Sequence, residues 1–229
     1  MKFPTINHLP WSQEIHREDK KFNAQLLYRF QENKVIITEK LDGGNACLSK
    51  DAVFARSHSA PADHPSFDHL KRLHASIREL IPKNTLIFGE NMYAVHSIVY
   101  EKLSHYFYIF AMYDIEGKHW YNWRAIEGIA KIFGIPTVPV IYKGLTSLKT
   151  LESWMIKNIT APSFLGREME GFVIRTYDMF YDHEFPQSVA KFVRKGHIQS
   201  DEHWKRNYVK QNLQGCFTGN STEDISRLY

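Results

Sequence analysis

Lys40 lies in a charged, glycine-rich stretch, Glu39–Asn45, between two apolar runs. A lysine amine held in a cleft can act as a nucleophile if desolvation and cationic neighbours lower its pKa toward the neutral form. The carboxylate of Asp42 could orient a proton or a sugar hydroxyl, and the two glycines that follow would let the backbone approach a bulky ligand. The same Lys-x-Asp-Gly string is also typical of an exposed hairpin turn. Other stretches must therefore decide between a reactive lysine and an ordinary turn.

Four further charged side chains stand at the ends of predicted strands or inside them. Arg56 ends a strand 16 residues after Lys40, and Glu90 directly follows an aromatic-glycine pair. Glu170 precedes a glycine and an apolar run, and Lys191 alternates with apolar residues. Taken singly, each is typical of a solvated strand end or an outward-facing strand position. Because they follow one another at the places where sheets should meet, together they predict one polar cleft.

The elements that would position these side chains are helices and strands, which the periodicity of apolar residues predicts in alternation along the chain. Helices are predicted over 67–80, ended by Pro82, over 122–133, ended by Gly134, and over 148–159. This order predicts an α+β fold of mostly antiparallel sheets flanked by helices, with one domain over 1–200 and a short helical tail over 201–229 that includes Asp201–Leu213. Strands are predicted at Lys34–Glu39, Asn45–Ser49, Ala52–Arg56, Thr85–Met92, His105–Tyr113, Thr137–Tyr142, Met169–Thr176 and Ser188–Arg194.

Composition limits the classes of protein that this chain could be. The formal net charge of +4 suits a polyanionic partner such as nucleic acid. The two cysteines suggest neither a disulfide framework nor a structural zinc site. No apolar run approaches the ~18 residues of a membrane span, and the first residues lack the apolar core of a signal peptide. We therefore expect a cytoplasmic, intracellular protein without a membrane partner.

The ordered motifs resemble those of the covalent nucleotidyltransferase superfamily, which contains ATP-dependent DNA and RNA ligases and mRNA capping enzymes. That family has a Lys-x-Asp-Gly motif, an arginine motif, an aromatic-Gly-Glu motif, an aromatic strand, a Glu-Gly motif and a lysine strand. The likeness runs from about residue 34 to residue 195. It is nearest to ligases of the RNA ligase 2 type, because Asn45 completes that group's Lys-x-x-Gly-x-Asn pattern and the 105–111 run is similar to its Phe-Tyr-hydrophobic-Phe strand. The resemblance implies a ligase adenylation (ATP-grasp-like nucleotidyltransferase) domain.

The resemblance also implies a role for each motif residue. Lys40 would attack ATP and carry AMP, while Glu170 would contact Mg²⁺ or Mn²⁺. Phe107 would stack on adenine, although Tyr108 and Phe110 are also candidates and at least one of these aromatics must be ordinary core. The other expected ATP-binding residues are Glu39, Asn45, Arg56 for the phosphates, Glu90 for the ribose hydroxyls, and Lys191, which is also expected to be catalytic.

The implied function is an ATP-dependent RNA ligase that joins 5′-phosphate and 3′-hydroxyl ends, as in RNA repair, through enzyme-lysyl-AMP and 5′-adenylated RNA. An accessory protein or a structured RNA would help to hold the ends. The chain departs from the family pattern at Val193, where a second lysine is common, which leaves the parts played by Arg194 and Lys195 open. Only 34 residues follow Lys195, too few for an OB-fold. The alternatives are a minimal ATP-dependent DNA ligase, a catalytically inactive RNA-binding relative and a GTP-using capping enzyme.

Overall fold

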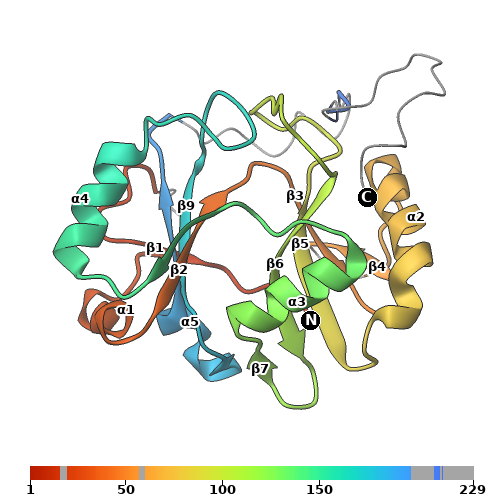
Figure 1. The fold of residues 1–229 in the computed structure, drawn as a ribbon, viewed down its shortest axis with the longest axis horizontal. Coiled ribbons are helices and arrows are strands. Elements are labelled where there is room, and N and C mark those ends of the chain that lie inside the picture. The colour runs from red at the N-terminus through yellow and green to blue at the C-terminus, as the bar shows by residue number, and fades with distance from the viewer. Residues whose placement is uncertain (16–19, 57–59, 197–208, 212, 214–229) are drawn as a thin grey trace, which may run out of the picture.

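The computed structural model describes residues 1–15, 20–56, 60–196, 209–211 and 213, which form two β-sheets with helices packed around them (Figure 1). The five-stranded sheet contains, in spatial order, β1 (Asn7–His8), β11 (Val189–Val193), β9 (Gly171–Thr176), β2 (Val35–Lys40) and β8 (Val140–Gly144). The six-stranded sheet contains β10 (Phe180–Tyr181), β7 (His119–Trp120), β6 (Phe107–Asp114), β5 (Thr85–Asn91), β3 (Gly44–Leu48) and β4 (Val53–Ala55).

Strand pairing within both sheets is antiparallel, apart from the parallel pair β1 and β11. This arrangement confirms the predicted α+β fold of mostly antiparallel sheets. The predicted tight hairpin at residues 50 and 51 is also confirmed, because Leu48 pairs with Val53 across it. The chain passes directly from β2 in one sheet to β3 in the other, so the turn after Lys40 lies where the two sheets diverge.

Three longer helices, α2 (Asp68–Ile77), α3 (Trp123–Phe133) and α4 (Leu148–Asn158), and two short ones, α1 (Tyr28–Glu32) and α5 (Phe185–Ser188), surround the sheets. In Figure 1, α1 and α4 lie beside the five-stranded sheet and α2 lies at the far edge of the six-stranded one. Helix α3 begins where the Asn122 side chain accepts a hydrogen bond from the Ala125 N–H, at 2.9 Å. It ends at Gly134, whose φ of 65° is left-handed, as the sequence predicts.

The first half of strand β2 packs against helix α4 through apolar side chains. Val35 and Ile37 pack in one buried cluster with Leu151 and Met155 of α4. Successive side chains of a strand point to opposite faces, so Thr38 and Lys40 face the other way, toward the six-stranded sheet. The helix side of β2 therefore anchors the strand, and its opposite side is left to present functional groups.

Some elements differ from the sequence prediction. Strand β8 begins at Val140, because Thr137 instead forms an isolated bridge to Ile109 of the other sheet. The strands β1, β7 and β10 are each two residues long, too short for a periodic signal. The predicted helix over 201–213 lies mostly outside the described residues.

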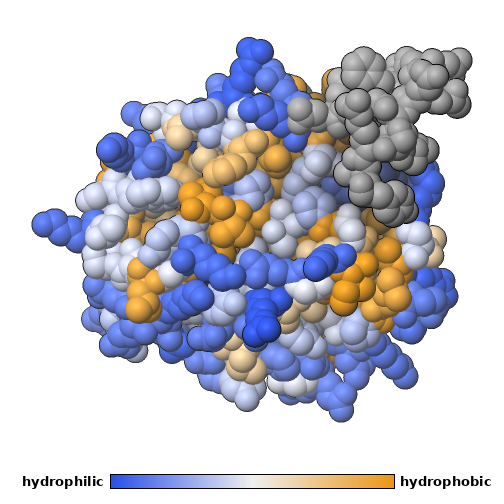
Figure 2. Space-filling model, viewed as in Figure 1, coloured by the Kyte–Doolittle hydropathy of each residue, from blue (hydrophilic) through white to orange (hydrophobic). Residues whose placement is uncertain are grey.

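Most of the surface in the view of Figure 1 is hydrophilic. Figure 2 shows apolar side chains gathered in the middle of this face and at its right side, with charged and polar side chains around them. No helix in the described part of the chain is long and apolar enough to cross a membrane.

Candidate active site

A cavity of about 650 Å³ opens between the two sheets, around the turn that follows β2. It is lined by strands of both sheets and by the N-terminal residues 2–6. Most of the charged or polar residues singled out in the sequence come together in its wall: Glu39, Lys40, Asn45, Arg56, Glu90 and Lys191.

Lys40 and Glu170 meet at this cavity through strand register. Lys40 pairs with Gly171 across β2 and β9, which brings the preceding residue, Glu170, alongside it. The Nζ atom of Lys40 lies 2.5 Å from Oε1 of Glu170. A Cβ at position 171 would collide with the backbone carbonyl of Phe192 on β11. The Glu-Gly pair thus combines a carboxylate for Lys40 with a residue small enough for close strand packing.

The charges around Lys40 act against the sequence expectation of a lowered pKa. Burial lowers the pKa of the Lys40 ammonium, but the carboxylates of Glu170, Glu90 and Asp42 raise it, and the net change is upward. This is a correction: acidic rather than cationic neighbours dominate in the protein without a ligand. The Lys40 side chain is therefore protonated in the protein without a ligand, and it must lose this proton before it can act as a nucleophile.

Glu90 and Asn45 are directly opposite each other on β5 and β3. Burial raises the Glu90 pKa to about 8, helped by Glu170 and Asp42 and opposed by Lys40. The carboxyl group is therefore mostly protonated near neutral pH, which lets it both donate and accept hydrogen bonds. A Cβ at Gly43 would lie 2.8 Å from the Asn91 carbonyl, so this glycine is needed for the turn to approach β5.

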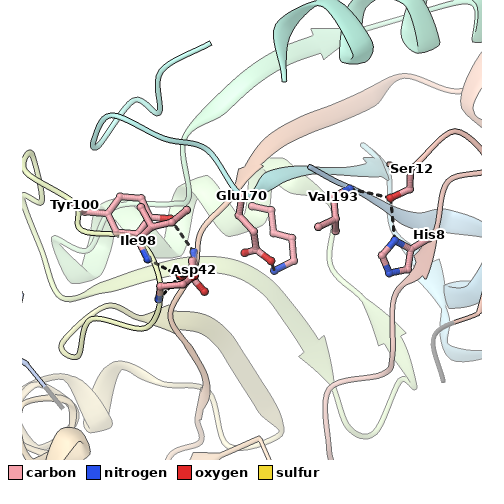
Figure 3. Close-up of polar contacts among 9 residues, drawn as sticks. His8, Ser12, Asp42, Ile98, Tyr100, Glu170 and Val193 are labelled. Carbon is pink, nitrogen blue, oxygen red and sulfur yellow. Dashed lines mark hydrogen bonds and ion pairs between the residues drawn. The ribbon is translucent and has the colours of Figure 1, made fainter. Parts of the chain in front are cut away.

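Asp42 holds the turn after Lys40 in place. Its Oδ2 accepts hydrogen bonds from the Ser97 N–H at 2.8 Å, the Ser97 hydroxyl at 2.6 Å and the Ile98 N–H at 2.9 Å. Its own N–H donates to the Tyr100 hydroxyl at 2.8 Å. From the sequence, this carboxylate was expected to orient a proton or a sugar hydroxyl. In the structure it instead binds the loop that contains Ser97 and Ile98. Figure 3 shows these contacts on one side of Glu170.

Lys191 is positioned from the opposite side by the N-terminal strand. His8 pairs with Lys191 across β1 and β11, and the Leu9 N–H donates to the Lys191 carbonyl at 2.7 Å. The Ser12 hydroxyl accepts a hydrogen bond from the Val193 N–H at 2.9 Å and lies 2.9 Å from Nδ1 of His8 (Figure 3). Strand β11 is therefore held on both edges, which orients the Lys191 side chain toward the cavity.

Glu39 lines the cavity but has its own partners. Its carboxylate accepts hydrogen bonds from the Ser163 hydroxyl at 2.5 Å and from the Phe164 N–H at 3.0 Å. Burial raises its pKa, although both hydrogen bonds oppose that change. The Glu39 side chain thus ties residues 163 and 164 to the strand that carries Lys40.

The placement of Phe107 corrects the sequence prediction. Phe107 is fully buried in the core and does not line the cavity. A Cβ at Gly89 would collide with the Phe107 ring, so the glycine beside Glu90 makes room for this ring on the face turned away from the cavity. Phe110, one of the alternatives, does line the cavity. Its ring packs edge-on against Phe3, with centroids 5.1 Å apart.

A sequence model of the RNA ligase family matches residues 33–193, which is most of the chain and contains every motif described above. The chain belongs to the RNA ligase family. No curated protein matches it.

Solved RNA ligases share the fold at low identity. The Naegleria gruberi RNA ligase with PPi has a TM-score of 0.56 and 19% identity over 84% of this chain and 59% of its own. An archaeal ATP-dependent RNA ligase has a TM-score of 0.56 and 16% identity over 84% of this chain and 48% of its own. A lysine-to-alanine variant of the N. gruberi enzyme, with ATP and Mn, has a TM-score of 0.57 and 18% identity. The chain therefore spans about half to three fifths of the length of these ligases.

Arg175 is a cavity residue to which the sequence interpretation assigned no role. It is buried and lines the cavity, and burial lowers the pKa of its guanidinium to about 10. It donates to the carbonyls of Thr176 and Tyr121 at 3.1 and 2.7 Å. Alternation along β9 places Val173 and Arg175 on one face, so the strand pattern could have pointed to it. The N-terminal residues 2–6 gave no comparable signal.

The acidic groups around Lys40 fit a hard divalent cation. Glu170, Glu90 and Asp42 place three carboxyl groups around Lys40, and carboxylate oxygens are ligands that Mg²⁺ and Mn²⁺ prefer. No group of three or more His, Cys, Asp or Glu side chains in the described ranges is arranged to hold a metal. Mg²⁺ commonly takes only one or two protein carboxylates and completes its shell with water and substrate phosphates, so this donor set suits it.

Proposed function

We propose that this member of the RNA ligase family is an ATP-dependent RNA ligase that seals 5′-phosphate and 3′-hydroxyl RNA ends. The observation that carries the proposal is that Lys40, paired with Glu170, lines a 650 Å³ cavity whose wall also holds Asn45, Arg56 and Lys191. A lysine at such a place is suited to accept a nucleotidyl group, and the flanking cations are suited to bind phosphates.

In the first step the deprotonated Lys40 amine attacks the α-phosphorus of ATP. The new P–N bond forms as the bond from this phosphorus to the oxygen bridging the α- and β-phosphates breaks, and pyrophosphate leaves. Arg56 and Lys191 supply fixed positive charge to the phosphates, and Glu90 binds the ribose hydroxyls. Such a reaction depends mainly on in-line positioning and charge neutralisation.

A bound Mg²⁺ would supply positive charge to the phosphates and would weaken the field of Glu170 on Lys40, which favours the neutral amine. Glu170 is the residue that would hold it. Without that charge the acidic side chains around Lys40, Glu170 above all, keep it protonated, so the proposal also explains why a nucleophile is surrounded by acids.

The remaining steps pass AMP to RNA and then release it. An oxygen of the RNA 5′-phosphate attacks the adenylyl phosphorus, the P–N bond breaks, and 5′-adenylated RNA forms while the lysine amine is restored. The 3′-hydroxyl of the second end then attacks the 5′-phosphate, and AMP leaves as the phosphodiester forms. We further propose that a structured RNA or an accessory protein holds the two ends together and that the protein acts inside the cell.

The test is covalent labelling with ATP and Mg²⁺, followed by denaturing electrophoresis. ATP labelled at the α-phosphate should mark the protein and ATP labelled at the γ-phosphate should not. Lys40→Ala should abolish the label, whereas Lys143→Ala, which removes an exposed lysine paired with Glu127, should retain it. Full labelling of Lys40→Ala would disprove the nucleophile assignment. An unlabelled wild-type protein that still binds RNA would favour a catalytically inactive relative.

A further inference from the structure

The described C-terminal residues return to a loop that is distant in sequence. The Val95 N–H donates to the Val209 carbonyl at 2.8 Å, and the Gln211 N–H donates to the Tyr93 carbonyl at 2.9 Å. Isolated bridges join Ala94 to Lys210 and Leu103 to Leu213. We call residues 209–213 the C-terminal clamp, of which 209–211 and 213 are described, and residues 93–103 the clamped loop.

Gln211 makes the most specific contacts of the clamp. It is 2% exposed. Its Oε1 accepts from the Tyr100 N–H at 3.1 Å, and its Nε2 donates to the Ile98 carbonyl at 3.1 Å. Its backbone carbonyl accepts from the Tyr106 hydroxyl at 2.8 Å. A buried amide left without these partners would be costly, so Gln211 selects one conformation of the clamped loop.

The two loop residues that bind the Gln211 side chain also bind Asp42. Ile98 receives a hydrogen bond from Gln211 at its carbonyl and donates its N–H to Asp42 Oδ2. Tyr100 donates its N–H to Gln211 and accepts the Asp42 N–H at its hydroxyl. Each residue is therefore a two-sided link between the C-terminal clamp and the turn that begins directly after Lys40.

We propose that Gln211 is a positioning residue for adenylation of Lys40, an inference that rests on the proposed function. By holding Ile98 and Tyr100, it keeps Asp42 and its turn in the place from which Lys40 meets the α-phosphate in line. Gln211 does not line the cavity, so it acts on the nucleophile and not on ATP binding. Misplacement of a reacting group by about 1 Å can slow a reaction ~10²-fold.

The kinetic test compares Gln211→Met, which keeps the side-chain length and removes both amide hydrogen bonds, with Val209→Ala as a matched control on the same clamp. Val209 is exposed, and its bond to Val95 uses only the backbone. Lysyl-AMP formation in a single turnover should be ~10-fold slower in Gln211→Met at saturating ATP, with the half-saturating ATP concentration changed less than ~2-fold. The control should match the wild type. A change confined to the half-saturating concentration would overturn the proposal.

A double substitution separates positioning from general structural damage. Asp42→Ala removes the carboxylate bonds to Ser97 and Ile98 but keeps the backbone N–H that donates to Tyr100. If Gln211 acts mainly through the Asp42 carboxylate, then Gln211→Met combined with Asp42→Ala should be slower than Asp42→Ala alone by much less than the ~10-fold loss expected for Gln211→Met. Two rate losses that multiply would show that Gln211 acts by another route and would overturn the inference. Should Gln211→Met fail to fold, Gln211→Asn keeps an amide at this buried position and shortens the side chain by one methylene, and it should show a smaller loss of rate.

Amide hydrogen exchange tests the linkage without relying on activity. The Ser97 and Ile98 amides, which donate to Asp42, should exchange faster in Gln211→Met than in the wild type, while the amides of β2 and β9 should not change. Unchanged exchange at Ser97 and Ile98 would overturn the inference even if the protein is an active ligase. If these amides exchange faster in Gln211→Met but the wild type forms no lysyl-AMP, the proposed function is refuted while the physical link between Gln211 and Asp42 is established.

Discussion

The Lys40 Nζ atom lies 2.5 Å from Glu170 Oε1, and this pair sets the resting state of the cavity. Glu170 is the strongest of the acidic influences that raise the Lys40 pKa. Lys40 is therefore kept as an ammonium until the charge around it changes. Binding of ATP with a divalent cation is the event that would change it, which would protect the amine from unproductive reactions between turnovers.

Replacing Glu170 with Gln should shift the pH dependence of lysyl-AMP formation. The reactive species is the neutral amine, so the rate should rise with pH as Lys40 loses its proton. Removing the Glu170 charge lowers the Lys40 pKa, and the rising limb should move to lower pH even though the plateau rate falls. Labelling rates across a pH series measure this. As a control, Glu168→Gln, which disturbs the pair with Arg194, should leave the pH dependence of the labelling rate unchanged. An unchanged pH dependence in Glu170→Gln would contradict the charge argument.

Glu90→Gln should stabilise the fold more at high pH than at low pH. The folded-state pKa of about 8 lies above the ordinary value of 4.5, so the folded protein holds this proton more tightly than the unfolded chain. The stability linked to this proton is fully present below about pH 4.5 and is lost as pH rises toward 8. Glutamine cannot ionise, so the unfolding temperature of the variant should exceed that of the wild type by more at about pH 9 than at about pH 5. The exposed Glu116→Gln should show no such pH-dependent gain.

Phe110→Ala should weaken ATP binding, whereas Phe107→Ala should reduce the stability of the fold. Phe110 lines the cavity, so we expect its loss to raise the ATP concentration needed for half-maximal labelling while the protein stays folded. Phe107 is fully buried, so its truncation should lower the free energy of unfolding by about 3–5 kcal/mol. Denaturant unfolding and ATP titration distinguish the two outcomes. A folded Phe107→Ala with a selective defect in ATP binding would restore Phe107 as the adenine-stacking candidate.

Lys191→Ala should slow lysyl-AMP formation at least ~10²-fold, equivalent to about 2.7 kcal/mol of barrier, because it removes a cation from the cavity wall. Arg194→Ala should have a smaller effect, since the Arg194 guanidinium donates to Glu168 at 2.9 Å. The comparison uses single-turnover labelling of both variants. The opposite order of effects would mean that the catalytic cation of β11 has been assigned to the wrong residue.

Sealing should favour RNA and depend strongly on salt. We expect a nicked RNA duplex to be sealed faster than a nicked DNA duplex, with rates that fall as salt rises because the basic chain contacts phosphates. The assay compares both nicks and single-stranded RNA, each with a 5′-phosphate, at two salt concentrations. Faster sealing of the DNA nick would identify a minimal DNA ligase, and labelling without sealing would indicate a different acceptor.

The sequence by itself determined the order of the main elements and the identity of most of the charged residues in the cavity wall. Strands β2, β3, β5, β9 and β11 carry local alternation or β-branched residues, and each brings a charged or polar side chain to the point where the sheets meet. The glycines next to Glu90 and Glu170 could also be recognised from the motifs. Their physical roles, room for the Phe107 ring and close packing on β11, became visible only in the structure.

Tertiary structure decided the features that depend on contacts between distant segments. A register shift between β5 and β6 passes over Phe110, so simple alternation could not tell which aromatic faces the cavity. The upward pKa shift of Lys40 is set by three acidic side chains that come from β5, the turn after β2 and the residue before β9. Residues 2–6 line the cavity next to β1, which pairs with the distant strand β11, and Gln211 binds a loop more than 100 residues earlier in the chain. Such pairings leave no local period in the sequence, because each one is specified only when both partners are already folded into place.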